Sequence, residues 1–235
     1  MNALKTLLAA SAAVLAVFGF ASCADSDSTP VNPPLPTGAF YNFATYNGSD
    51  ASACSFTVQR EGDAGSAVIT FAQTFTDKQI KTGDRVFMAY TTESGKQYVS
   101  GAGKLYNFVN VTGGKPVEAT AANSARLSTP VKMEEMKRTG GYLNMVFRIP
   151  VSRNLKNLCL TEEANTKDPA YPVLALFIES DVQEGEYRQG RVSFDVTDVL
   201  APADVKGIRV AYKDDAGLDT LTFNKIDAGT IKPIE

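Results

Sequence analysis

The sequence contains no histidine and no tryptophan, and it has only three cysteines among its 235 residues. Histidine is the side chain most used for acid–base catalysis and metal binding near neutral pH. Its absence excludes Ser/His/Asp and Cys/His catalytic groups as well as His-rich zinc sites. Without tryptophan, a stacking platform for a sugar has to use tyrosine or phenylalanine.

An excess of basic residues is also missing, since the formal net charge is −3. A protein that binds nucleic acid needs cations to neutralise phosphates and release counterions. We therefore expect no nucleic-acid partner. Beyond the first 20 residues, no apolar run approaches the roughly 18 residues that indicate a membrane-spanning helix.

The first 22 residues have the layout of a secretory signal, which we predict to end at Ser22. Lys5 is their only charged side chain, the apolar run Leu7–Phe20 follows, and Ala21 and Ser22 are small. A basic start, an apolar middle and small residues at the cut are typical of an export signal.

The residue after this cut is Cys23, and Phe20-Ala21-Ser22-Cys23 resembles the lipobox of bacterial lipoproteins, with Phe20 where leucine is usual. We therefore predict cleavage between Ser22 and Cys23 and a lipid on Cys23 that anchors the protein in the membrane. Each buried methylene of an acyl chain contributes about 0.8 kcal/mol to such an anchor. An ordinary signal peptide or a short transmembrane anchor is the alternative.

Residues 23–38 predict a flexible tether, because they are rich in polar residues and include four prolines between positions 24 and 36. Asp25 and Asp27 resemble the acidic stretch that follows the lipidated cysteine in some surface-exported lipoproteins. We expect a lipid-anchored location in the cell envelope, at the outer membrane, with surface display favoured over a merely soluble spacer.

Alternation with period two dominates from residue 53 onward and predicts β-strands. In residues 54–59 the apolar positions share one face, and further strands are expected near residues 68–71, 85–92 and 97–111. Turn residues separate these runs. We predict a small OB-like antiparallel barrel as an N-terminal domain at residues 39–125.

The remainder, residues 126–235, predicts an antiparallel β-sandwich of about six or seven strands. Leu143, Met145, Phe147 and Ile149 alternate with Tyr142, Asn144, Val146 and Arg148, which predicts a strand with one buried face. Residues 173–178 are continuously apolar, as in a strand covered on both sides. A further strand places Val192 and Phe194 inward, with Ser193, Asp195 and Thr197 outward. The fold class is therefore all-β.

Cys54 and Cys159 could pair in an oxidising compartment, but they lie in different predicted domains. A disulfide requires Cα atoms within about 7 Å of each other. We predict two buried, unbridged thiols, and a disulfide is the alternative.

Four short motifs resemble the NigD-like lipoproteins, over roughly residues 53–226. In chain order they are Gly83-Asp84-Arg85-Val86 leading to Tyr90, Lys104-Leu105-Tyr106-Asn107, Gly140-Gly141-Tyr142-Leu143-Asn144, and Tyr212-Lys213-Asp214-Asp215-Ala216-Gly217. The resemblance implies an N-terminal OB-type barrel and a C-terminal β-sandwich. It implies no activity, and it carries over no functional residue except the lipidated Cys23. The sequence departs from the family at Met133-Glu134-Glu135-Met136, where an aromatic strand is typical.

Three sets of side chains are candidates for a catalytic, metal-binding or ligand-stacking site. Paired carboxylates could hydrolyse a glycoside, but adjacent carboxylates on a strand point to opposite faces. Three aspartates could bind calcium, although Asp-Ala-Gly between two strands is already explained as a turn. Several tyrosines could stack on a ligand, although those near the N-terminus are better explained as packing on the barrel. The carboxylate pairs are Glu134-Glu135, Glu162-Glu163 and Asp195/Asp198. The possible calcium ligands are Asp214, Asp215 and Asp219. The tyrosines are Tyr41, Tyr46, Tyr98, Tyr106, Tyr142, Tyr171 and Tyr187.

We therefore expect no catalytic, cofactor-binding or metal-binding residue. The favoured function is a non-enzymatic envelope lipoprotein that binds or scaffolds an unknown protein or glycan partner, with the membrane contacted through Cys23. A fimbrial or other structural subunit of a surface assembly is the alternative, and a carboxylate-based glycosidase ranks below both.

Overall fold

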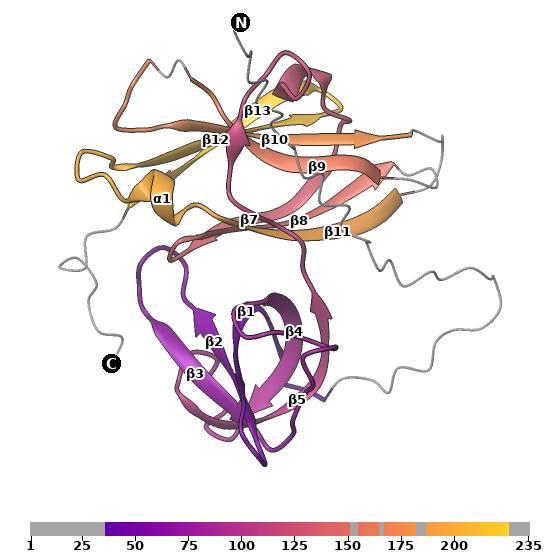
Figure 1. The fold of residues 1–235 in the computed structure, drawn as a ribbon, viewed down its shortest axis with the longest axis vertical. Helices are drawn as coiled ribbons and strands as arrows, with labels where there is room; N and C mark the ends of the chain where they lie inside the picture. Colours follow the sequence, from indigo (N-terminus) through magenta and orange to yellow (C-terminus); the bar gives the residue numbers. More distant parts are fainter. Residues whose placement is uncertain (1–35, 151–154, 165–166, 182–186, 226–235) are drawn as a thin grey trace, which may run out of the picture. The chain divides into compact units, whose positions relative to one another are not determined.

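Two β-architectures follow one another along the chain (Figure 1). A computed structural model describes residues 36–150, 155–164, 167–181 and 187–225, and within these ranges it contains thirteen strands and two short helices. No helix in the described part of the chain is both long and apolar enough to cross a membrane.

Five strands close into a barrel in the order β1-β2-β3-β5-β4. Neighbours run antiparallel except for β3 and β5, which are parallel. This order returns to its start through the β1–β4 pair and so leaves no free edge. The barrel strands are β1 (Phe40–Ser49), β2 (Cys54–Gln59), β3 (Ser66–Phe71), β4 (Arg85–Thr92) and β5 (Gly101–Asn110).

Strand β1 differs from the sequence-based expectation, in which this segment packs onto the barrel. It is instead a full strand of the barrel, hydrogen-bonded to β2 and to β4. Its buried residues include the adjacent pair Phe43 and Ala44, and its register with β2 shifts between Tyr46 and Gly48. Because of these two irregularities, the segment lacks the simple alternation that identifies a strand.

Eight strands form two sheets of a sandwich. The larger sheet has the order β13-β12-β10-β9-β6 and the smaller sheet the order β11-β8-β7. Most pairs are antiparallel, but β10–β12 and β6–β9 are parallel. The strands are β6 (Val117–Glu118), β7 (Lys132–Thr139), β8 (Tyr142–Pro150), β9 (Leu155–Glu162), β10 (Val173–Ser180), β11 (Tyr187–Asp195), β12 (Gly207–Asp214) and β13 (Gly217–Asn224), and the helices are η1 (Ala125–Leu127) and α1 (Thr197–Leu200).

The all-β fold class, a barrel followed by a sandwich, is confirmed. The short strand β6 joins a sandwich sheet through β9, although residues 39–125 were expected in the barrel domain. The domain division itself stays a prediction.

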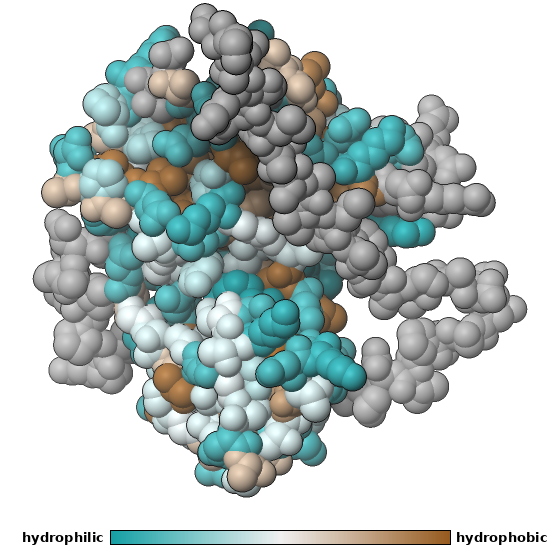
Figure 2. Space-filling view, viewed as in Figure 1, coloured by the Kyte–Doolittle hydropathy of each residue, from teal (hydrophilic) through white to brown (hydrophobic). Residues whose placement is uncertain are grey.

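On the face drawn in Figure 2, hydrophilic residues cover much of the described surface, and hydrophobic residues lie between them in small groups.

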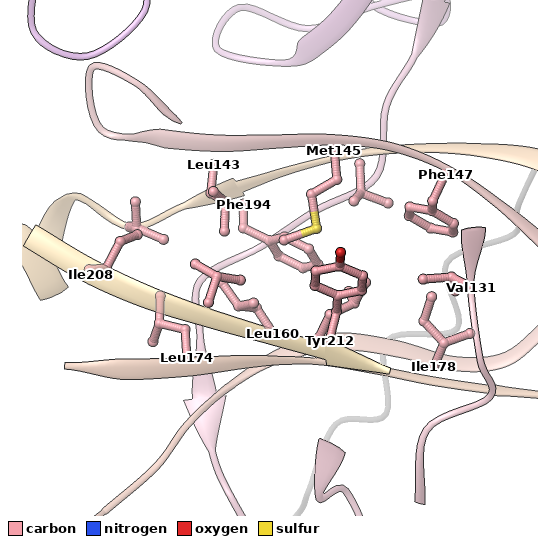
Figure 3. Packing of buried hydrophobic residues seen from close by; sticks show 14 of the residues in the cluster. Val131, Leu143, Met145, Phe147, Leu160, Leu174, Ile178, Phe194, Ile208 and Tyr212 are labelled. Carbon is pink, nitrogen blue, oxygen red and sulfur yellow. The ribbon is translucent and has the colours of Figure 1, made fainter. Parts of the chain in front are cut away.

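The sandwich core lies between the two sheets (Figure 3). Leu143, Met145 and Phe147 from β8 face residues of β10 and β12 such as Leu174 and Ile208, and all five are buried. The alternation in residues 143–149 therefore predicted this inward face correctly. A second core fills the barrel around Phe56, Ile69, Met88 and Tyr90.

Both cysteines in the described residues are free thiols. Cys54 is buried in the barrel core, and burial raises the pKa of its thiol to about 11. Cys159 lies on β9 and is only half-buried, so the prediction of two buried thiols is correct for Cys54 alone. Partial burial also raises the pKa of Cys159. Neither thiol is therefore ionised near neutral pH, and both are poor nucleophiles.

Candidate functional site

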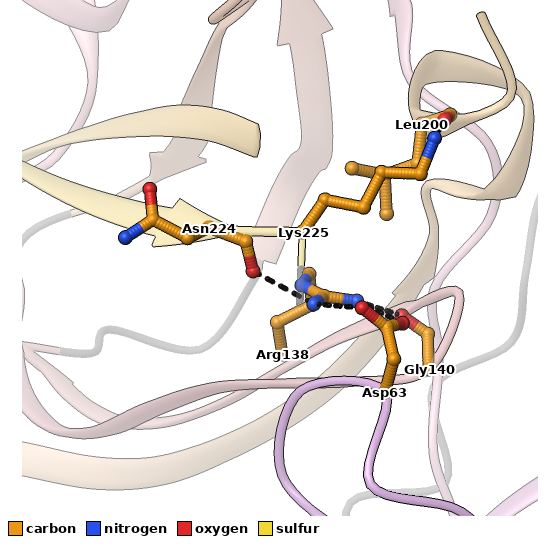
Figure 4. Close-up of polar contacts among 6 residues, drawn as sticks. All are labelled: Asp63, Arg138, Gly140, Leu200, Asn224 and Lys225. Atoms are coloured by element: carbon orange, nitrogen blue, oxygen red, sulfur yellow. Dashed lines mark hydrogen bonds and ion pairs between the residues drawn. The ribbon is translucent and has the colours of Figure 1, made fainter. Parts of the chain in front are cut away.

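A buried arginine of the sandwich, Arg138 on β7, contacts the loop between β2 and β3 of the barrel (Figure 4). Its two terminal nitrogens donate to the two carboxylate oxygens of Asp63, each at 2.7 Å. They also donate to the backbone carbonyls of Gly140 and Asn224, at 2.7 and 2.8 Å. A bidentate pair of this kind fixes orientation as well as charge. Barrel and sandwich belong to one compact unit, residues 34–235.

A second buried arginine makes the reciprocal contact, from the barrel into the sandwich. Arg85, the first residue of β4, donates to the side-chain oxygens of Ser193 at 3.0 Å and of Asn144 at 3.0 Å, and to Thr45 of its own barrel at 2.8 Å. Its guanidinium lies 4.0 Å from the centre of the Tyr142 ring. These partners are neutral, and burial lowers the pKa of Arg85 to about 10.

Two of the four resemblance motifs meet at this contact. Arg85 comes from Gly83-Asp84-Arg85-Val86, and Tyr142 and Asn144 come from the motif that starts with the double glycine. Gly140 has φ +55°, as a tight turn between β7 and β8 requires, and a Cβ there would lie 2.7 Å from the side-chain amide nitrogen of Gln59 of the barrel. Residues of both motifs therefore hold barrel and sandwich together.

The same contact corrects the expected burial of the smaller sheet. Ser193 was expected on a solvent-facing side, and β8 was expected to bury one face only. Both Ser193 and Asn144 are buried, because Arg85 of the barrel covers them. A pattern within one strand reports which residues face its own core, but it does not report a neighbour that packs on the opposite face.

The departure from the family pattern at residues 133–136 coincides with a β-bulge. The register between β7 and β8 shifts between Met133 and Glu135, which leaves Glu134 as the extra residue. Glu134 accepts hydrogen bonds from Arg148 Nε and from Gln189 Nε2, both at 2.5 Å. These hydrogen bonds hold the pKa of Glu134 below its usual value, and the bond from Gln189 has the larger effect.

Beyond the barrel contact, the outer face of the smaller sheet carries a group of polar and aromatic side chains. Arg191 donates to the side-chain oxygen of Gln189. Lys132 lies 4.1 Å from the centre of the Tyr187 ring. We define the outer-face cluster as Lys132, Glu134, Arg148, Tyr187, Gln189 and Arg191. It holds three cations and one carboxylate, within a chain whose net charge is −3.

Aromatic residues of the barrel continue this cluster. The guanidinium of Arg191 lies 4.8 Å from the centre of the Phe87 ring of β4, and Tyr41 of β1 stacks on Phe87 with 6.4 Å between ring centres. Tyr41 is 51% exposed and Tyr187 is 43% exposed. One surface is thus built from strands of both the barrel and the sandwich.

The expectation that Glu134 and Glu135 point to opposite faces is wrong. The bulge places Glu135 opposite Val146, whose side chain shares the outer face with Arg148. Each carboxylate is paired with a different cation, since Glu135 contacts Lys137 at 3.0 Å. Alternation fails here because a bulge inserts one residue into the strand.

The remaining carboxylate candidates take part in local structure or lie at the surface. Asp195 accepts the backbone N–H of Thr197, and Asp198 pairs with Lys115 at 2.6 Å. Glu162 ends β9 at an exposed position, followed by the half-buried Glu163. The structure does not bring these groups together with the pair on β7.

The aspartates of the last hairpin form a turn, as expected. Asp214 accepts the backbone N–H groups of Ala216 and Gly217, and Asp219 accepts the hydroxyl of Tyr212 at 2.8 Å. Within the described ranges, no group of three or more Cys, Asp or Glu side chains is placed to hold a metal ion.

The tyrosines do not form one platform. Tyr46 is buried in the barrel core, Tyr142 lies under Arg85, and Tyr171 lies beside Arg209 on the sandwich. Tyr98 and Tyr106 each lie against a cation of the barrel, Arg60 and Lys104. Only Tyr41 and Tyr187 of the expected set belong to the surface described above. Ser22 and Cys23 lie outside the described residues.

Sequence reasoning missed Arg85 and Arg138 as buried residues, and it missed Arg148, Gln189 and Arg191 as a group. Arg85 had a signal, since it lies within a resemblance motif. Arg148, Gln189 and Arg191 come together only through the pairing of β11 with β8, in which Arg148 lies opposite Gln189. A single sequence gives no signal for such a pairing.

No family model and no curated protein matches the sequence. Among solved structures, a protein of unknown function, DUF1344, from Bacteroides vulgatus is 20% identical with a TM-score of 0.64, over 84% of this chain and 96% of that one. A NigD-like immunity protein from Bacteroides caccae is 15% identical with a TM-score of 0.55, over 81% and 92%.

A protein described as a lipoprotein from Bacteroides fragilis is 8% identical with a TM-score of 0.56, over 81% of this chain and 99% of that one. At these identities the likeness concerns the fold. The resemblance to NigD-like lipoproteins is therefore confirmed at that level: the chain has the barrel-and-sandwich fold that a NigD-like protein also has.

Proposed function

We propose that the protein is a lipid-anchored envelope protein that binds a partner and catalyses no reaction. The observation that carries this proposal is the exposed surface formed by the outer-face cluster together with Phe87 and Tyr41. It combines strands of the barrel and the sandwich, which two buried arginines hold in contact. A surface of this kind is formed before a partner arrives, so binding it requires little reordering.

The anchor rests on the lipobox-like sequence that ends at Cys23, and the fold shared with a protein described as a lipoprotein supports it. The B. caccae neighbour is described as an immunity protein, which favours binding over catalysis for this fold. Outer-membrane placement with the described part exposed to the outside completes the proposal.

Metabolic labelling with an alkyne fatty acid tests the anchor. The wild-type chain should incorporate the label and the variant Cys23→Ala should not, whereas Cys54→Ala and Cys159→Ala should label like the wild type. Label retained by the Cys23 variant contradicts the lipid anchor.

Site-specific photo-crosslinking on intact cells tests the binding surface. A crosslinker placed at Gln189, in the outer-face cluster, should yield a discrete adduct. The same group placed at Ser94, in the exposed connection after β4, is the matched control and should yield none. Equal adducts at both positions, or none at Gln189, contradict a binding surface on this face.

A further inference from the structure

The outer-face cluster carries positive charge on an acidic protein. Lys132, Arg148 and Arg191 lie around Glu134, whose carboxylate accepts hydrogen bonds from Arg148 and Gln189. The neighbouring Glu135 on the same face is paired with Lys137, so an excess of positive charge remains. Both Lys132 and Arg148 are exposed, and the side chain of Arg148 is 57% accessible. Opposite charge on the partner raises both encounter rate and specificity. The ligand complementary to this face is therefore an anion.

The place of Arg148 on the central strand of its sheet excludes one way of binding a peptide there. Strand β8 is hydrogen-bonded along both sides, to β7 and to β11. Arg148 lies near the C-terminal end of β8 and presents a side chain rather than a free backbone edge. An extended acidic peptide cannot add to the sheet at this position, because strand addition requires an unpaired edge.

The composition of the cluster also disfavours a folded protein as its ligand. The centre of a protein–protein interface is normally apolar and poor in charged residues. Here the centre holds the charged residues Glu134, Arg148 and Arg191 with the amide of Gln189 between them. The aromatic residues Tyr187, Phe87 and Tyr41 lie around it. Acidic sugars combine hydroxyl and carboxylate oxygens with apolar ring faces, and they match a surface with cations at its centre and aromatic rings beside them.

We infer that the outer-face cluster binds an acidic polysaccharide, with Lys132 and Arg148 contacting its anionic groups and Tyr187 and Tyr41 contacting its sugar rings. This inference rests on the proposed binding function and names the chemical class of the partner. Glu134 opposes the ligand's charge while it orients Arg148 and Gln189.

Binding of defined polysaccharides by the full chain, purified in a non-ionic detergent, tests the inference. The acidic set is polygalacturonate, hyaluronan and heparin, and fully methyl-esterified polygalacturonate is the matched neutral polymer. We expect at least one acidic polymer to bind about tenfold more tightly than the neutral one. This preference should weaken as salt is raised from low to physiological concentration.

Charge-matched variants localise the binding. The double variant Lys132→Gln/Arg148→Gln should lose about tenfold in affinity for the acidic polymer. The control Lys78→Gln/Lys96→Gln removes the same charge from exposed positions on other connections and should change affinity by less than about twofold. Glu134→Gln removes the carboxylate next to Arg148 and should tighten binding by about two- to fivefold.

Failure of all three acidic polymers to bind overturns the inference, as does equal binding of the esterified polymer or an equal loss in the control variant. A crosslinked acidic protein at Gln189, with no polysaccharide bound, overturns the glycan assignment and leaves the proposed binding function standing. Absence of both the adduct and polysaccharide binding overturns both.

Discussion

The two buried arginines that join the barrel to the sandwich differ in how their charge is balanced. Arg138 faces the carboxylate of Asp63 and two backbone carbonyls, whereas Arg85 faces two hydroxyls, an amide oxygen and the ring of Tyr142. Burial penalises the charge of Arg85 and lowers its pKa to about 10. The comparison shows that a buried arginine can join two β-architectures by charge pairing or by hydrogen-bond geometry.

Among changes at the two arginine contacts, removing the partner charge of Arg138 should have the largest effect on stability. The side chain of Arg138 is 2% exposed and that of Asp63 is 31% exposed. The variant Asp63→Ala leaves the buried guanidinium of Arg138 without its carboxylate and should lower the free energy of unfolding by about 3 kcal/mol. This value is at the lower end for buried ion pairs because Asp63 is partly solvated. Urea unfolding followed by circular dichroism measures this loss.

The double variant Asp63→Ala/Arg138→Met is the control for that interpretation. Removing the stranded cation should restore part of the lost stability, since an apolar side chain of similar volume is tolerated where an unpaired charge is not. A double variant less stable than Asp63→Ala alone contradicts charge pairing as the source of the effect.

At Arg85, loss of the hydrogen-bond acceptor Asn144 should destabilise the protein more than loss of the cation itself. Asn144 accepts hydrogen bonds from both Arg85 and Ser193 and donates to Thr139 at 2.7 Å. Asn144→Ala removes the acceptor of a buried charged donor and should cost about 2 kcal/mol. For a domain of about 200 residues, this corresponds to a fall in melting temperature of roughly 4–8 °C.

Replacing the second cation itself should cost less. Arg85→Met removes a charge that burial already penalises, and Ser193 can still donate to Asn144 at 2.7 Å. We expect a stability change below about 1 kcal/mol, measured in the same urea titration. A loss equal to that of Asp63→Ala would show that the two arginines are equivalent, and the comparison between them would fail.

The fold was accessible from the sequence because strand periodicity and resemblance motifs report local structure. Phe147, Met145 and Leu143 were correctly placed in the core by alternation alone. The arginine contacts were not accessible, because each joins residues at least 59 positions apart across the two β-architectures: Arg85 with Asn144 and Ser193, and Arg138 with Asp63. The outer-face cluster depends on the bulge at Glu134, whose only sequence signal was the departure from the family's aromatic strand.

The smallest stability effect is expected on the face that the arginines leave uncovered. Arg148 and Phe147 are neighbours on β8, but Phe147 faces the core and Arg148 makes an exposed ion pair with Glu134. Arg148→Ala should change stability by less than about 1 kcal/mol, the usual worth of a surface pair, while Phe147→Ala should cost about 3–5 kcal/mol. Urea titrations of both variants measure this contrast. A large loss in Arg148→Ala would mean that the outer-face cluster supports the fold, as the two junction arginines do. Weaker polysaccharide binding by Arg148 variants would then report unfolding rather than a lost contact. A stable Arg148→Ala variant instead separates binding from folding, because a cation on this face that contributes nothing to stability is available to a ligand.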